Sequence, residues 1–111
     1  MSTINFDQLY QNLESGITTL AKSSLQEYLT AAQTDGQNAL AGIKSNLQQW
    51  AQAVANGSLS FEDLAFLLKG EDALTGMTAL KQAGLAEVRI DSFKNDLINL
   101  IAGTVGNFIK V

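Results

Sequence analysis

The sequence predicts an all-α protein in which a long antiparallel helical hairpin packs with shorter C-terminal helices into a small bundle. Apolar residues recur at spacings of three and four through most of the 111 residues, which is the period of an amphipathic helix. Proline is absent, which suits long uninterrupted helices. An alternating polar and apolar stretch at residues 86–90 is too short to form a stable sheet by itself.

The chain is short enough to form one domain. We expect residues 1–57 to form the long hairpin, and residues 58–111 to form short helices followed by an apolar final helix. Cysteine is absent, so no disulfide can brace the fold and its stability must come from packing.

The first helix is predicted over residues 6–33. Candidate N-cap residues precede it: Ser2, Thr3 and Asn5. Its apolar stripe consists of Phe6, Leu9, Leu13, Ile17, Leu20, Leu25, Tyr28 and Ala32. At 1.5 Å per residue this helix would be about 42 Å long, more than the core of so small a chain can cover. Either shorter helices pack along it, or one end protrudes and is used for assembly.

We place the turn of the hairpin at Asp35–Gly36, because Asp followed by Gly favours a turn. A single helix that continues across this point is the alternative. The second helix follows with an apolar stripe at heptad spacing: Leu40, Ile43, Leu47, Trp50 and Val54. Its other faces carry Gln, Asn, Ser and Ala, with Lys44 as the only charged residue. It ends at Asn56–Gly57, where positive φ is tolerated.

The third helix is predicted from Phe61 to Lys69 by the residues at its two ends. Ser60 is the expected N-cap, and Asp63 stands three residues later, where an acid can return a hydrogen bond to the cap. Gly70 is expected to end this helix.

A fourth helix is expected to begin at Glu71 and Asp72, since acids are favoured in a first helical turn. Its buried face would be formed by Leu74, Met77 and Leu80. Gly84 fits the C′ position of a Schellman motif, in which Leu85 folds back on Leu80.

The final helix, residues 91–111, is the most apolar segment and should lie between the other elements. Its apolar positions are Phe93, Leu97, Ile98, Leu100, Ile101, Ala102, Val105, Phe108 and Ile109. One narrow polar stripe remains: Asn95, Asn99, Gly103, Gly106 and Lys110. Residues 86–90 are compatible with an extended segment or with a longer final helix, and we take Asp91 as the N-cap.

The residue types that most enzyme chemistry needs are missing. There is no histidine and no cysteine, which removes the usual general base at neutral pH, the commonest metal ligands and the thiolate nucleophile. The acid pairs Glu62–Asp63 and Glu71–Asp72 lie at predicted helix N-termini, where acids are favoured without any metal. No glycine-rich phosphate-binding motif occurs. We therefore expect a non-enzymatic protein with no cofactor, no metal and no small-molecule substrate.

The charge balance disfavours nucleic acid as a partner, because the net charge is −4 and phosphate backbones select basic surfaces. Only 16% of the residues are charged, against about a quarter in ordinary soluble proteins. Gln, Asn, Ser and Thr supply much of the polar surface instead. This surface is either solvated, or it packs against other copies or a partner, where few charges need to be desolvated.

The N-terminal sequence lacks a basic segment followed by an apolar one, so a cleaved secretory signal is not expected. The apolar core of the final helix, residues 97–109, is shorter than the roughly twenty residues of a bilayer span. We expect a cytoplasmic protein, or one that is exported or packaged without a cleaved signal.

These observations favour a structural or interaction protein that packs with itself or with another helical protein, as in a virion, a secretion apparatus or a filament. The candidate interaction surface is the outer side of the first helix: Gln8, Gln11, Asn12, Ser15 and Thr19. The helix over residues 40–54 is the next candidate. The alternative function is a membrane-active or lipid-binding protein that releases its apolar final helix, although that helix offers few basic residues to a membrane surface.

Overall fold

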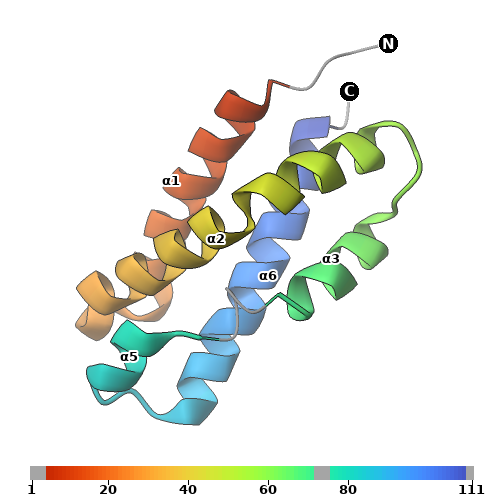
Figure 1. Ribbon diagram of the computed structural model, residues 1–111. Helices are drawn as coiled ribbons and strands as arrows, with labels where there is room; N and C mark the ends of the chain where they lie inside the picture. Colours follow the sequence, from red (N-terminus) through yellow and green to blue (C-terminus); the bar gives the residue numbers. More distant parts are fainter. Residues whose placement is uncertain (1–4, 72–75, 110–111) are drawn as a thin grey trace.

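The final helix, α6 (Glu87–Ile109), lies at the centre of the molecule. In this computed structural model, which describes residues 5–71 and 76–109, α6 contacts each of the other described α-helices. Those helices are α1 (Phe6–Ser24), α2 (Leu29–Ala55), α3 (Phe61–Lys69) and α5 (Thr78–Gln82), with a short 3-10 helix, η1 (Gln26–Tyr28), between α1 and α2 (Figure 1). The described residues form helices and no strand, which confirms the all-α bundle.

Helices α1 and α2 form the predicted antiparallel hairpin, and both contact α6. Figure 1 shows α1 and α3 on opposite sides of α6, so α3 lies at an edge of the bundle. The molecule is elongated, with principal extents of 47 × 23 × 19 Å, because the hairpin and α6 run side by side along its length.

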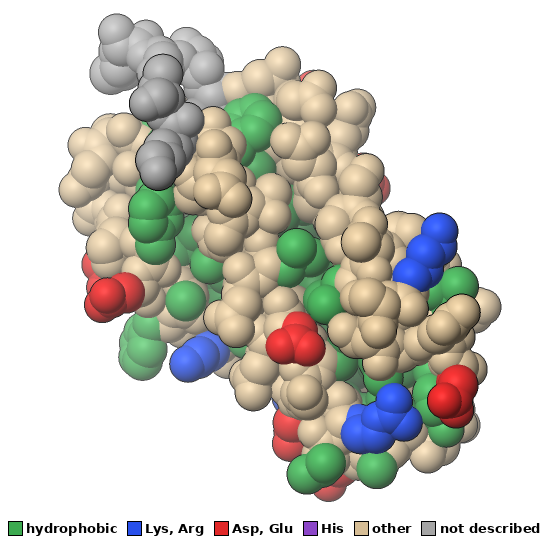
Figure 2. Space-filling model, turned by 180° about the vertical axis from the view of Figure 1, so that it is seen from behind, with side chains coloured by type: hydrophobic (Ala, Val, Ile, Leu, Met, Phe, Trp, Pro, Cys, Tyr) green, Lys and Arg blue, Asp and Glu red, His purple; other side chains and the backbone are tan. Residues whose placement is uncertain are grey.

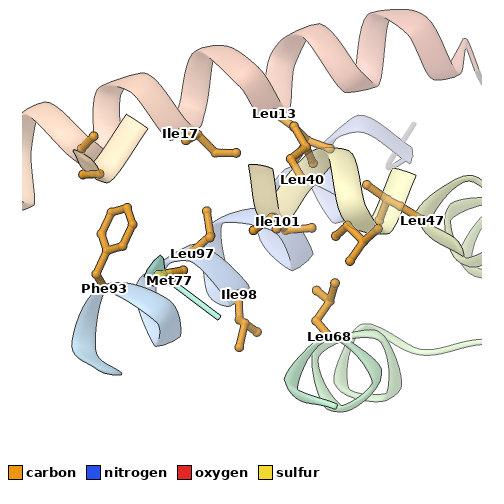
Figure 3. Close-up of a cluster of buried hydrophobic side chains, with 14 of the residues drawn as sticks. Leu13, Ile17, Leu40, Leu47, Leu68, Met77, Phe93, Leu97, Ile98 and Ile101 are labelled. Carbon is orange, nitrogen blue, oxygen red and sulfur yellow. The ribbon is translucent and has the colours of Figure 1, made fainter. Parts of the chain in front are cut away.

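The core forms where the inward stripes of the helices meet. Figure 3 shows side chains from α1, α2, α3 and α6 pointing toward one another, with Met77 from the segment before α5. Fully buried members include Leu9, Leu13, Ile17, Leu40, Ile43, Leu47, Leu64, Leu68, Leu80 and Leu97. Burial of each such side chain contributes roughly 1.5–3 kcal/mol, so the predicted apolar stripes supply most of what holds the bundle together.

The first helix is shorter than predicted, and the hairpin turns at a different place. α1 ends at Ser24, and Leu25 leaves the helical region with φ −136° and ψ 52°. η1 then leads directly into α2. The predicted helix over residues 6–33 and the predicted turn at Asp35–Gly36 are therefore wrong, and α2 continues through Asp35–Gly36 as the alternative proposed.

The reason is that Asp35 and Gly36 serve packing between helices rather than a turn. Both residues are buried within α2. The Asp35 carboxylate accepts hydrogen bonds from the backbone N–H groups of Ala79 and Leu80, at 3.0 and 2.7 Å. A Cβ atom on Gly36 would lie 2.6 Å from Cγ2 of Ile17, so glycine lets α2 approach α1 closely here.

The predicted caps of the other helices are largely confirmed. The Gln8 backbone N–H donates to Asn5 Oδ1 at 3.1 Å, which starts α1, whereas Ser2 and Thr3 lie outside the described residues. At the start of α3, the Asp63 N–H donates to Ser60 Oγ and the Ser60 N–H donates to Asp63 Oδ2, a complete capping box.

Two helix ends confirm the glycine predictions. Gly57 has φ +84° after α2, and Gly84 has φ +90° after α5, conformations that residues with a Cβ atom rarely adopt. The Leu85 N–H donates to the Leu80 carbonyl at 3.1 Å, which is the long hydrogen bond of a Schellman motif.

The starts of the last two helices differ from the predictions. Glu71 is not helical, and α5 begins at Thr78; the expected positions of Asp72 and Leu74 lie outside the described residues. α6 begins at Glu87, because the Ala86 carbonyl accepts from the N–H groups of Arg89 and Ile90, both at 3.0 Å.

Asp91 therefore lies inside α6 and is not its N-cap, and residues 87–90 are helical rather than extended. In the polar stripe of α6, Asn95, Asn99 and Gly103 are exposed, Gly106 is half-buried, and Lys110 lies outside the described residues. None of the helices described is both long and apolar enough to span a bilayer.

Candidate interaction surfaces

The five residues of the predicted surface form one exposed stripe on α1. Gln8, Gln11, Asn12, Ser15 and Thr19 are all exposed. They follow one another at spacings of one, three and four, so they share one side of the helix. The buried residues Leu9, Leu13 and Ile17 occupy the opposite side. The structure thus brings all five predicted residues together on the outer face, hereafter the α1 stripe.

Hydrogen bonds along α1 hold part of this stripe in place. The Gln8 side-chain amide donates to Asn12 Oδ1 at 3.0 Å, and the Thr19 hydroxyl donates to the Ser15 carbonyl at 3.1 Å. Bonds of this kind fix rotamers before any partner arrives, so less conformational entropy remains to be lost on contact.

The outer face of α2 is also poor in charge. Asp35 and Lys44 are the charged residues of this 27-residue helix, and Asp35 is buried. Toward the end of α2 the exposed side chains form a shallow, open hollow lined by Ser45, Gln48, Gln49, Gln52, Ala53 and Asn56. This neutral surface lies within the second candidate region, residues 40–54, and extends slightly beyond it.

An aromatic cluster joins the two helices of the hairpin at the free end of α1. The ring centroids of Phe6 and Tyr10 lie 6.0 Å apart, and Lys44 Nζ lies 4.6 Å from the centroid of the Tyr10 ring. Burial, with a smaller effect of the Glu14 charge, raises the pKa of the Tyr10 hydroxyl above its usual value of 10.0. Tyr10 therefore stays neutral at physiological pH and acts as a packing residue, with Lys44 over its face.

Among the described residues, three large hydrophobic side chains are exposed: Phe61, Phe66 and Val88. Phe61 still lies against α6, because a Cβ on Gly106 would be 3.0 Å from its ring. Phe66 is 76% exposed on α3. We did not predict Phe66 as a surface feature, although the helical period contains the signal: Leu64 and Leu68 point inward, so the residue midway between them points outward.

The described residues contain no group of three or more acidic side chains close enough together to hold a metal ion. The acids of Glu62–Asp63 stand at the start of α3, where Asp63 completes the capping box. Glu71 accepts a hydrogen bond from the Asn46 side-chain amide at 3.0 Å. Each of these acids has a local explanation in helix capping or packing.

Comparison of the chain with known protein families, with curated proteins and with solved structures finds no match. We therefore infer function from the surfaces described above.

Proposed function

We propose that this protein is a non-enzymatic helical interaction protein, which packs the surface of its hairpin against other copies of itself or against another helical protein of a larger assembly. The observation that carries this proposal is the α1 stripe, an exposed row of amide and hydroxyl side chains, near which α1 carries only three charged residues, Asp7, Glu14 and Lys22. Neutral polar groups can be buried at an interface when they find hydrogen-bond partners, whereas unpaired charges are far more costly to bury.

The low proportion of charged residues, 16% of the sequence, supports the same proposal. Figure 2 shows acidic and basic side chains as isolated spots on a largely uncharged face. Interfaces are depleted in charged residues at their centres, and amide side chains can exchange water for partner groups there. The length of the hairpin adds a continuous contact surface along much of the 47 Å extent of the molecule.

The membrane-active alternative would require α6 to leave the bundle. Its side chains Phe93, Leu97 and Ile101 are buried between the other helices. Among its described basic residues, Lys94 pairs with Asp91 at 3.5 Å, and Arg89 lies near the Tyr28 ring. The central position of α6 thus favours the interaction proposal, and we do not propose a membrane function.

The double variant Gln11→Lys with Thr19→Lys tests the role of the α1 stripe. Both side chains are exposed, so the isolated fold should stay within about 0.5 kcal/mol of the natural protein and keep its helical circular-dichroism spectrum. At an interface the two lysines would have to be desolvated, so the mass in solution should fall toward that of smaller species.

A matched control places two lysines elsewhere, at Gln82 on α5 and Asn95 on α6, both exposed. This control adds the same charge and should leave association unchanged. Association whose strength and stoichiometry are unchanged by Gln11→Lys with Thr19→Lys would move the interface away from the α1 stripe, first to the outer face of α2. A natural protein that is monomeric at all concentrations would refute the proposal.

A further inference from the structure

Helix α3 presents an aromatic side chain to solvent at the edge of the bundle. It packs on α6 and, to a lesser extent, on α2, through Leu64 and Leu68. Phe66 points away from these contacts and is 76% exposed. Because Leu64 and Leu68 are buried, Phe66, midway between them, lies on the opposite side of this helix. A phenylalanine with so much of its surface exposed contributes little to packing among the residues that the structure describes.

The charges that flank Phe66 have a definite order. Glu62 stands four residues before it and Lys69 three residues after it, so both lie on the same side of the helix as the ring. Both are exposed. Along the helix axis, the outward side of α3 therefore carries an acidic, an aromatic and a basic side chain in that order. We call these three residues, Glu62, Phe66 and Lys69, the α3 face.

We propose that the α3 face binds the same face of a second copy of this chain, with the two helices antiparallel across a two-fold axis between the Phe66 rings. In a two-fold interface, each contact between residue i of one copy and residue j of the other occurs twice, the second time with the two copies exchanged. Glu62 of each copy then faces Lys69 of its partner, which makes two ion pairs around a central aromatic pair. A parallel arrangement would instead place like charges together, so the order of the charges selects the antiparallel second copy.

This inference rests on the proposed function, because it takes self-association as given and names a second copy as the partner. The contact that it proposes uses the α3 face and not the α1 stripe. Figure 1 places α1 and α3 on opposite sides of α6, so both contacts can form on one molecule. The α3 helix has 9 residues. At 1.5 Å per residue it is about 14 Å long, so its interface is small and the dimer should be of the weak, transient class, with a dissociation constant of roughly 10 μM or higher.

Charge exchange between Glu62 and Lys69 gives the sharpest test, read by sedimentation equilibrium from about 10 μM to 1 mM. Glu62→Lys alone and Lys69→Glu alone each place like charges opposite one another, so each should raise the dissociation constant by about tenfold or more. The two single variants mixed in equal amounts should associate again, because every facing pair is then opposite in sign. The double variant Glu62→Lys with Lys69→Glu should also self-associate.

Removal of the ring gives an independent test with a matched control. Phe66→Ala should weaken the dimer by about tenfold or more, since a central aromatic side chain carries much of the energy of a small interface. Val88→Ala removes a side chain of similar exposure, 78%, from the start of α6, away from the α3 face. It should leave the dissociation constant unchanged. Both variants should fold normally because both side chains are exposed.

The outcomes separate this inference from the proposed function. Repeating the series in the Gln11→Lys, Thr19→Lys background removes the contact of the α1 stripe and should leave a dimer. If the protein associates and its dissociation constant is unchanged by the charge exchange and by Phe66→Ala, the α3 dimer is overturned while the proposed function stands. Single variants that are weakened without recovery on mixing would also overturn it, since loss of helix stability would then explain them. A monomer at 1 mM would overturn both.

Discussion

Asp35 and Gly36 show how the surroundings of a residue change its role. Asp followed by Gly is one of the strongest turn signals, yet both residues lie within α2. Gly36 provides room for Ile17, and Asp35 binds the backbone of α5. Neither role can be read from residues 35 and 36 alone, because each depends on a segment at least 19 positions away that the fold brings into contact.

Gly36→Ala should destabilise the protein by about 1–3 kcal/mol, because the new methyl group would collide with Ile17. Gly103→Ala is the matched control, since nothing lies within 4 Å of a Cβ at this exposed position in α6. It should be neutral or stabilising by up to about 1 kcal/mol, because Ala is the better helix former. Urea unfolding measures both. Equal stability of the two variants would contradict the close approach of α1 and α2.

At the scale of the helices, capping explains the elements that the sequence predicts well. α3 begins and ends at the predicted residues, because Ser60, Asp63 and Gly70 carry local signals. The end of α1 at Ser24 was missed, since only weak helix formers, Ser23 and Ser24, mark it. The start of α6 was left open between an extended segment and a longer helix, because residues 86–90 alternate in polarity as a strand would; the longer helix is the one observed, and the choice of Asp91 as its N-cap was wrong.

Asp35 links two elements that are otherwise hard to connect from sequence. α5 has only 5 residues, too few to be stable as an isolated helix, and the Asp35 carboxylate bonds two N–H groups in its first turn. Asp35→Ala should cost about 1–3 kcal/mol in urea unfolding and should speed amide exchange at Ala79 and Leu80. Asp91→Ala, which removes only an exposed ion pair, should cost less than about 1 kcal/mol. Unchanged protection at Ala79 would show that this cap is unimportant.

For the whole molecule, the sequence predicted the parts that depend on apolar periodicity. The all-α bundle, the central position of the final helix and the outward direction of the α1 stripe all follow from residues spaced by three and four. The position of the hairpin turn did not follow, because it depends on contacts between α2, α1 and α5. Phe66 was missed because an exposed aromatic residue contributes nothing to a core pattern.

The mass in solution as a function of concentration tests the central claim most directly. Light scattering or sedimentation of the unaltered protein should be carried out from about 10 μM to 1 mM, the range of concentration in which weakly associating proteins form dimers. If the neutral surface of the hairpin and the α3 face are interaction surfaces, the mean mass should exceed that of the single 11.9 kDa chain and should rise with concentration. A constant mass of 11.9 kDa over the whole range would contradict the account.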